Sequence, residues 1–289
     1  MTVSTASTGS ARGRSVARGG RLLTHLLLIG VIIALVWEGS AVLNQNREIH
    51  AAQENQTKLF QEYDFDPGYI ISDRSFFDSD ALTSSQIQRF FDKVNSGCSG
   101  DFCLKSYKFK TDKVGADGLC KGFSGGQDQT AAAIIDGSAR SCGISQKVLL
   151  VMLQKEQGLV TAKSVDRTQV NSAMGLSCPD NGPCDQDYLG FFKQVYGAAK
   201  RFKYYQAHAS RYPYKPASLA EVRYNPAPSC GSSRVYIRNQ ATALLYTYTP
   251  YQPNEAALKA GDGQGDSCST YGNRNFAFYY RYWFGSPFL

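Results

Sequence analysis

The most apolar segment of the chain lies near its N-terminus. Residues 26–37 form an unbroken run of 12 apolar residues, and further apolar residues extend it to 22–43, where Glu38 is the only formally charged residue. A run of this length matches the core of a signal peptide, whereas a membrane-spanning helix needs about 20 residues. Because the best cleavage candidate, Gly39-Ser40-Ala41, is a poor one, we favour an uncleaved signal anchor and keep a cleaved signal peptide as the alternative.

The segments on either side of the apolar run are polar. Residues 1–21 hold four arginines and no acidic residue, and their Ser, Thr and Gly content predicts a disordered basic tail. Basic residues before an apolar segment stay in the cytoplasm, so we expect everything after it to lie outside the membrane. Residues 44–66 predict a helical or flexible polar stalk, and an extracytoplasmic domain is expected over 67–289.

Apolar residues in the expected domain recur mostly at the spacing of helices. Thr83 and Gln86 have capping-box spacing and open a helix in which Ile87 and Phe91 share a face. No series with the two-residue period of strands stands out, so we predict a mainly α fold. Further helices are predicted over about 128–139, 145–158, 185–205, 233–248 and from about 273 onward.

Eight cysteines indicate an oxidising compartment if they pair, because cytosolic thiols are kept reduced. Three of them lie in the glycine-rich segment 96–127, which we predict to be a disulfide-pinned loop with a short hairpin around 107–109. Many connectivities are open to eight cysteines, and we favour pairs that are near in sequence. The expected disulfides are Cys98–Cys103, Cys178–Cys184, Cys120–Cys142 and Cys230–Cys268. Because the sequence has no Cys-x-x-Cys pair and its histidines are scattered, we expect no metal and no cofactor.

The positive charge of the chain is mild outside its N-terminal tail. The formal net charge is +7, and 27 basic and 23 acidic side chains follow residue 43. Such a bias suits an anionic cell wall or membrane surface and is too small for a nucleic-acid interface. Ordinary solubility charge is the alternative interpretation.

An acidic residue occupies an apolar helix face within 145–158. Ser145 is expected to cap this helix with its side chain, and Gly158 to end it. One face carries Leu149, Met152, Leu153 and Glu156. The apolar setting and the partial negative charge at a helix C-terminus both favour the protonated form of Glu156. A protonated carboxyl could donate its proton to a glycosidic oxygen. From spacing alone we favour the alternative, a surface glutamate paired with Lys155 or another basic residue.

Two segments resemble the lysozyme-like superfamily, which includes goose-type lysozymes and lytic transglycosylases. Residues 153–158, Leu-Gln-Lys-Glu-Gln-Gly, are similar to the helix end that carries the catalytic glutamate in that superfamily. Residues 171–176, Asn-Ser-Ala-Met-Gly-Leu, resemble a later segment that lines the cleft. Gln157 stands where serine is usual, and Ser177-Cys178 replaces Met-Gln.

The resemblance implies a lysozyme-like domain that cleaves peptidoglycan, with Glu156 as general acid and then general base. It also implies substrate-binding roles for Gln157, Ser172, Met174 and Gly175, and for a tyrosine of a late helix, where Tyr246 and Tyr248 are the candidates. A hydrolase would need a second carboxylate at a defined separation, and no clear partner is evident. The candidates are Asp166, Asp180, Asp185 and Asp187, each of which is alternatively a turn or cap residue. A single-acid mechanism that uses a hydroxyl of the substrate is therefore slightly favoured.

A broader resemblance over about 67–285 implies a second functional hypothesis. The blocks at 68–73, 154–160, 233–237 and 271–276 look like a group of exported actinobacterial proteins commonly labelled hemagglutinins. Fifteen of the 18 tyrosines lie between Tyr188 and Tyr282, and aromatic rings stack on sugars as well as on each other. We expect Tyr246, Tyr248 and Tyr251 to approach a cleft, and Tyr279, Tyr280 and Trp283 to be mostly core. The alternative function is thus non-catalytic binding of cell-surface glycan.

Overall fold

The computed structural model describes residues 1–2, 4–5, 15–179 and 182–289, and it divides into two compact units, Met1–Ala51 and Ala52–Leu289. Helix α1, Ser15–Tyr63, contributes to both units. Most of the tail that we expect to be disordered lies outside the described residues, although the helix already covers 15–21.

The first unit contains the apolar half of α1. Its large apolar side chains are exposed around the helix, with Trp37 at 75% and Leu43 at 60%. One helical segment near the N-terminus, Leu28–Tyr63, is long and apolar enough to cross a membrane. Because a helix that is apolar on all sides is stable only where water is excluded, the segment 22–43 fits an anchor or a signal sequence.

Helices make up about half of the chain, in agreement with the predominance of helical spacing in the sequence. Helix α3 has the predicted capping box, in which the Thr83 side chain accepts from Gln86 N and Gln86 reaches back to Thr83 N. The longer helices of the second unit are α3 (Ser84–Val94), α4 (Ala131–Cys142), α5 (Gln146–Gln157), α7 (Phe191–Ala207), α8 (Gln240–Tyr248) and α10 (Gly272–Phe284). The short helices are α2 (Asp73–Phe77), α6 (Arg167–Asn171) and α9 (Glu255–Lys259), with 3-10 turns at Gln186–Tyr188, Ala209–Arg211 and Pro228–Cys230.

Two small antiparallel sheets make the fold mixed rather than mainly α. Strands β1 (Lys108–Thr111) and β2 (Gly126–Thr130) form the first sheet, so the hairpin expected around 107–109 exists but closes over a longer loop. Strands β3 (Ser218–Arg223) and β4 (Ser232–Ile237) form the second. The helix predicted over 233–248 is therefore wrong for residues 233–237, which belong to β4, and only its later part is helical.

Local capping explains where the helices differ from the predicted ranges. The Asn239 side chain accepts from Thr242 N, which starts α8 only after β4 has ended. The Thr130 side chain caps Ala133 N in the same way, so α4 begins three residues after the predicted start at 128. The helix predicted over 185–205 is interrupted at Gly190, whose φ of +102° is incompatible with a helix.

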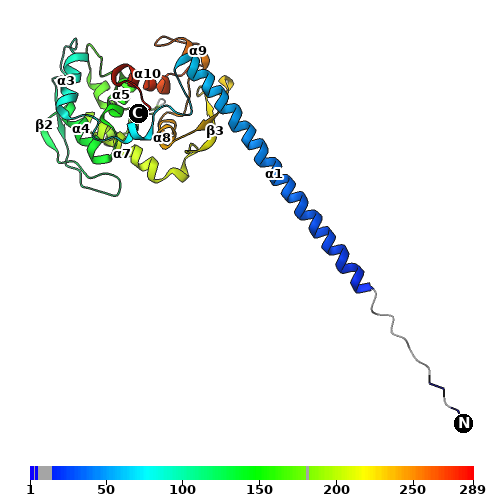
Figure 1. Ribbon diagram of the computed structural model, residues 1–289. Coiled ribbons are helices and arrows are strands. Elements are labelled where there is room, and N and C mark those ends of the chain that lie inside the picture. The colour runs from blue at the N-terminus through cyan, green and yellow to red at the C-terminus, as the bar shows by residue number, and fades with distance from the viewer. Residues whose placement is uncertain (3, 6–14, 180–181) are drawn as a thin grey trace. The chain divides into compact units, whose positions relative to one another are not determined.

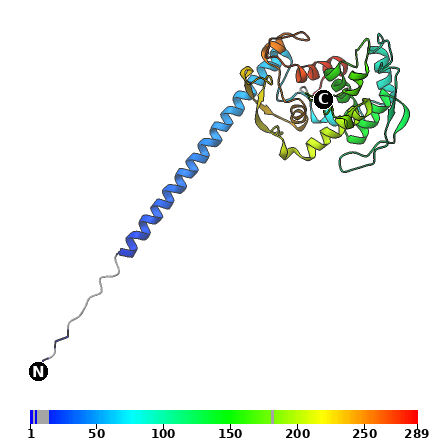
Figure 2. The ribbon, with the colours of Figure 1, turned by 180° about the vertical axis from the view of Figure 1, so that it is seen from behind.

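Helix α5 lies at the centre of the second unit. It packs against α4 and α10, and every residue from Val148 to Leu153 is fully buried. In both views α10 lies at the upper side of this unit and α7 at its lower side (Figures 1 and 2). Ser145 occupies the cap position of α5, but its buried hydroxyl makes no hydrogen bond among the described residues, so the predicted cap contact is wrong.

The compact unit begins before the expected boundary at residue 67. Gln56, 1% exposed, accepts from Tyr236 N at 2.8 Å and donates to Asp66 Oδ1 at 3.1 Å. A Cβ at Gly68 would collide with the Gln56 side chain, which explains the glycine at that position. The second half of the segment expected to be a stalk is therefore part of the folded unit.

All four expected disulfides are present. They join Cys98 to Cys103, Cys120 to Cys142, Cys178 to Cys184 and Cys230 to Cys268. Cys120–Cys142 ties the loop between β1 and β2 to the end of α4, and Cys230–Cys268 ties the 3-10 turn before β4 to the loop before α10. The pairs support placement of this unit in an oxidising, extracytoplasmic compartment.

An ion pair fixes the β1–β2 loop to α7 and gives a pH-dependent prediction. Asp117 pairs with Lys200 and accepts from the backbone of Leu119 and Cys120 at 2.9 Å each. These contacts, led by Lys200, lower the pKa of Asp117 to about 2. The unfolded chain has the ordinary value of about 4, so the stabilisation is complete above that pH and is lost as the pH falls towards about 2.

We expect Asp117→Asn to lower the melting temperature slightly at pH 7, because the pair is partly exposed and contributes less than about 1 kcal/mol. Melting curves of the wild type and the variant from pH 7 to pH 2 should converge at the acidic end. A difference that widens towards pH 2 would contradict this assignment.

Candidate active site around Glu156

Glu156 lies in the last turn of α5, where the buried helix reaches the surface. Its side chain is 22% exposed, whereas Met152 and Leu153 are fully buried. Gly158 ends the helix with a φ of +66°, as predicted. The carboxylate is thus at the rim of the core rather than within it.

The nearest charged group to Glu156 is its neighbour in sequence. The Lys155 ammonium contacts Glu156 Oε1, donates to Thr249 Oγ1 at 3.0 Å and lies 5.8 Å from the Tyr248 ring centre. Its side chain is only 2% exposed. The pairing with Lys155 that the sequence left as the alternative is the one observed.

The two segments that resemble the lysozyme-like motifs meet at this carboxylate. A Cβ built on Gly175 would lie 3.2 Å from Glu156 Oε2, and Gly175 has a φ of +65°. Met174 is fully buried, and its carbonyl accepts from the Tyr248 hydroxyl at 2.6 Å. Glycine is therefore required at 175 both by the backbone and by the space that Glu156 occupies.

Gln194, which the sequence analysis did not single out, holds the glycine segment in place. It is fully buried on α7 and accepts from Met174 N at 3.0 Å and from Leu176 N at 3.1 Å. Its amide donates to Leu176 O at 2.9 Å and to Tyr188 O at 2.8 Å. The signal in the sequence is a polar residue beside the apolar positions of a helix, where a buried amide must find partners.

Substituting Gly175 by alanine should be more destabilising than the same change at Gly143. Both positions have nearly the same φ, +65° and +64°, but a Cβ at Gly143 has nothing within 4 Å. The left-handed backbone alone costs roughly 1 to 2 kcal/mol for a non-glycine residue, and only Gly175→Ala also displaces Glu156. Urea unfolding of the two variants measures the difference, and equal losses would show that the Gly175–Glu156 contact has no energetic weight.

Of the two candidate tyrosines on α8, Tyr248 lies near Glu156 and Tyr246 does not. Burial raises the pKa of Tyr248 well above its usual range, and the nearby charge of Glu156 raises it further. Tyr246 is fully buried, and its hydroxyl donates to Pro67 O at 2.9 Å, so its predicted place in a cleft is wrong. Tyr251 lies in the segment between α8 and α9, where its backbone forms a bridge with Arg223.

The other predicted substrate-binding residues lie near the site but make local contacts. Gln157 is partly exposed and its carbonyl accepts from Gln169 Nε2 at 3.4 Å. The Ser172 hydroxyl donates to Thr168 O at 2.9 Å. Both remain predictions, because these bonds leave their exposed surfaces open to a ligand.

The aspartates proposed as partners of Glu156 mostly have structural roles. Asp166 caps α6 by accepting from Gln169 N at 2.8 Å, and Asp185 accepts from Asp187 N at 3.0 Å at the start of a 3-10 turn. Asp180 lies outside the described residues. In the described part of the chain no group of three or more His, Cys, Asp or Glu side chains could hold a metal ion.

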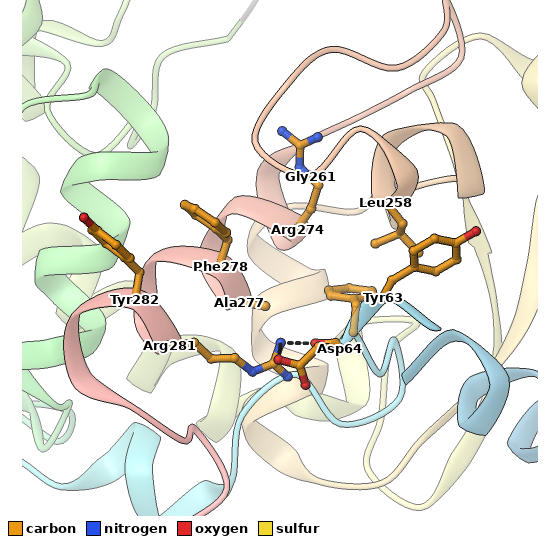
Figure 3. A pocket seen from close by; sticks show the side chains of 10 residues that line it. Tyr63, Asp64, Leu258, Gly261, Arg274, Ala277, Phe278, Arg281 and Tyr282 are labelled. Carbon is orange, nitrogen blue, oxygen red and sulfur yellow. Dashed lines mark hydrogen bonds and ion pairs between the residues drawn. The ribbon is translucent and has the colours of Figure 1, made fainter. Parts of the chain in front are cut away.

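A cavity of about 430 Å³ lies between the end of α1 and α10, and its lining residues hold these segments together (Figure 3). Arg281 pairs with Asp64 across it at 3.0 Å, and Arg274 donates to Ala257 O and Gly263 O at 2.9 Å each. Its two arginines are therefore already engaged by the protein. Of the α10 aromatic residues expected to be core, Tyr280 is buried, whereas Tyr279 and Trp283 are partly buried.

In comparisons with known proteins, no family, no curated protein and no solved structure matches this chain.

Proposed function

We propose that the unit Ala52–Leu289 cleaves the glycan strands of the cell wall by a lysozyme-like or lytic-transglycosylase-like mechanism. One observation carries the proposal: the two segments with motif resemblance, 153–158 and 171–176, are brought together at Glu156 Oε2 by Gly175. The partial exposure of Glu156 supports access for a substrate. The proposed substrate is peptidoglycan or a related glycan.

The chemistry would use Glu156 alone. The carboxyl group donates its proton to the glycosidic oxygen as the bond from that oxygen to the anomeric carbon breaks. A hydroxyl of the same sugar then attacks the anomeric carbon and returns its proton to Glu156, which closes the cycle without a second carboxylate. Because the resting carboxylate is paired with Lys155, this cycle requires proton uptake as the ion pair opens, and Thr249 Oγ1 remains available to the ammonium.

The ion pair also favours a second candidate function. A carboxylate held by a buried ammonium is well suited to accept hydrogen bonds from sugar hydroxyls and poorly suited to donate a proton. The same domain would then be a non-catalytic, hemagglutinin-like binder of cell-surface glycan.

The placement that we propose is a single-pass membrane protein with its C-terminal unit outside the cell. The apolar segment 22–43 and the four disulfides support it. Secretion after cleavage of the apolar segment is the alternative. No nucleic-acid partner is proposed, since the positive charge is mild.

Incubation of the full chain, solubilised in detergent, with purified peptidoglycan sacculi distinguishes the functions. Soluble muropeptides detected by mass spectrometry support cleavage, and anhydro ends identify the single-acid route. Cosedimentation with the sacculi without release of fragments supports the binder. Absence of both release and cosedimentation rules out both functions.

A further inference from the structure

The ammonium group of Lys155 has a second partner besides Glu156. Its side chain is 2% exposed, and the ammonium contacts Glu156 Oε1 and donates to Thr249 Oγ1 at 3.0 Å. The centre of the Tyr248 ring lies 5.8 Å from it. Water has little access to a group that is buried to this extent, so the ammonium depends on these two oxygens for its hydrogen bonds.

Thr249 is itself fixed by α8 and by the start of α10. Its N–H donates to Leu245 O at 2.8 Å, and its carbonyl accepts from Asn273 Nδ2 at 3.0 Å. A Cβ on Gly272 would lie 2.6 Å from Thr249 Cγ2, so the glycine allows the threonine methyl group to pack there. The hydroxyl that binds Lys155 therefore belongs to a residue whose backbone is hydrogen-bonded on both sides.

The contacts continue from Thr249 to the second oxygen of Glu156. The Lys155 ammonium engages Oε1, whereas a Cβ built on Gly175 would lie 3.2 Å from Oε2. Because Lys155 holds one oxygen, the other is directed at the 171–176 segment. A residue that fixes the ammonium therefore also fixes the direction of the carboxyl group.

The contribution of Thr249 should be largest when Glu156 carries a proton. The proposed cycle begins with a protonated carboxyl group, which no longer neutralises Lys155. A buried ammonium that loses its partner is strongly destabilising, and Thr249 Oγ1 is the acceptor that stays beside it. The Thr249 hydroxyl should therefore influence turnover and not the binding of substrate.

We propose that Thr249 is a positioning residue of the Glu156 site and acts through Lys155. It holds the ammonium whether the carboxyl group is ionised or protonated, so that Glu156 Oε2 stays directed at the 171–176 segment. The inference rests on the proposed function for its effect on turnover. The action of Thr249 through Lys155 can also be measured without turnover.

Two substitutions that separate the hydroxyl of Thr249 from its methyl group test the effect on turnover. Thr249→Val removes the hydroxyl and keeps the shape, whereas Thr249→Ser keeps the hydroxyl and removes the methyl group. Thr249→Val in the full chain should lower the maximal rate of muropeptide release from purified sacculi on the order of tenfold, because a hydrogen bond to a charged group contributes about that factor or more. The amount of sacculi that gives half of the maximal rate should not change, and Thr249→Ser should recover most of the lost rate.

Thr247→Val is the matched control, because Thr247 lies on the same helix and its hydroxyl donates to Ala243 O at 2.8 Å. Its rate of release should equal that of the wild type. The inference is overturned if Thr249→Val and Thr247→Val release fragments at the same rate. It is also overturned if Thr249→Ser is as slow as Thr249→Val, since packing of the methyl group would then explain both losses.

Urea unfolding of the full chain tests the same contact without turnover. Thr249→Val should lower the urea midpoint of the otherwise unchanged chain and leave that of Lys155→Met unchanged, because methionine has no ammonium that needs the hydroxyl. Equal losses in both backgrounds would contradict the inference. If the wild type releases no fragments and the loss depends on Lys155, cleavage is refuted and the assignment of Thr249 is supported. Cleavage at an unchanged rate by Thr249→Val refutes the assignment of Thr249 alone.

Discussion

Replacing Glu156 with glutamine is expected to reduce the release of fragments from peptidoglycan about a thousandfold, the usual contribution of a positioned general acid. Glutamine has nearly the same shape and can still accept the hydrogen bond from Lys155, but it cannot donate a proton as an acid. The fold should therefore persist while the proposed chemistry is lost. The rate of muropeptide release, measured by mass spectrometry against time, checks this expectation.

Glu255→Gln is the matched control for this variant. Glu255 lies at the start of α9 and accepts from the Tyr63 hydroxyl at 3.2 Å, outside the Glu156 site. Its release rate should equal that of the wild type. If Glu156→Gln and Glu255→Gln release fragments at the same rate, Glu156 is not the proton donor and the catalytic proposal fails.

Features that depend on local geometry could be predicted from the sequence. The Thr83–Gln86 capping box and the end of α5 at Gly158 involve residues within a few positions of each other. Proximity in sequence also predicted the two disulfides whose cysteines are nearest to each other, Cys98–Cys103 and Cys178–Cys184. Local side-chain and backbone contacts form wherever the chain later packs, so their sequence patterns keep their meaning.

Features that depend on distant partners could not be predicted in the same way. Val235 and Ile237 alternate with polar residues as in a strand, but Ile237 also continues at helical spacing into Ala241 and Leu244. These residues form a strand because they pair with β3, which is separated from them by a proline-rich turn. A short apolar pattern is compatible with both structures until its partner is known.

The pairing of Lys155 with Glu156 is another consequence of distant residues. This pair is an alternative that the sequence offers, but neighbours in a helix do not normally face each other, so adjacency alone does not establish the contact. The buried Lys155 ammonium is held by Thr249, which follows α8, and Gly272 at the start of α10 leaves room for Thr249, since a Cβ there would lie 2.6 Å from Thr249 Cγ2. The electrostatics of the candidate acid are thus set by two segments about a hundred residues further along the chain.

Replacing Gln194 with leucine is expected to lower the free energy of unfolding by about 3 to 5 kcal/mol, because each buried polar group left without a partner costs about 1 to 3 kcal/mol. Leucine fits the volume of the glutamine but leaves the N–H groups of Met174 and Leu176 and the carbonyls of Leu176 and Tyr188 unpaired. Partial hydration of the loosened segment limits the loss to less than the sum of four groups. Urea unfolding of the full chain, followed by near-UV circular dichroism, measures it.

Gln206→Leu is the matched control on the same helix. Gln206 is partly exposed and accepts from Lys203 Nζ at 2.6 Å, so its replacement should cost less than about 0.5 kcal/mol. If both leucine variants are equally stable, Gln194 does not hold the 174–176 segment. If Gln194→Leu is destabilised as expected, it should also release Gly175 from its position beside Glu156. Fragment release should then fall by a larger factor than the fraction of folded protein does. A residue with a purely structural role elsewhere in the core would lower both by the same factor.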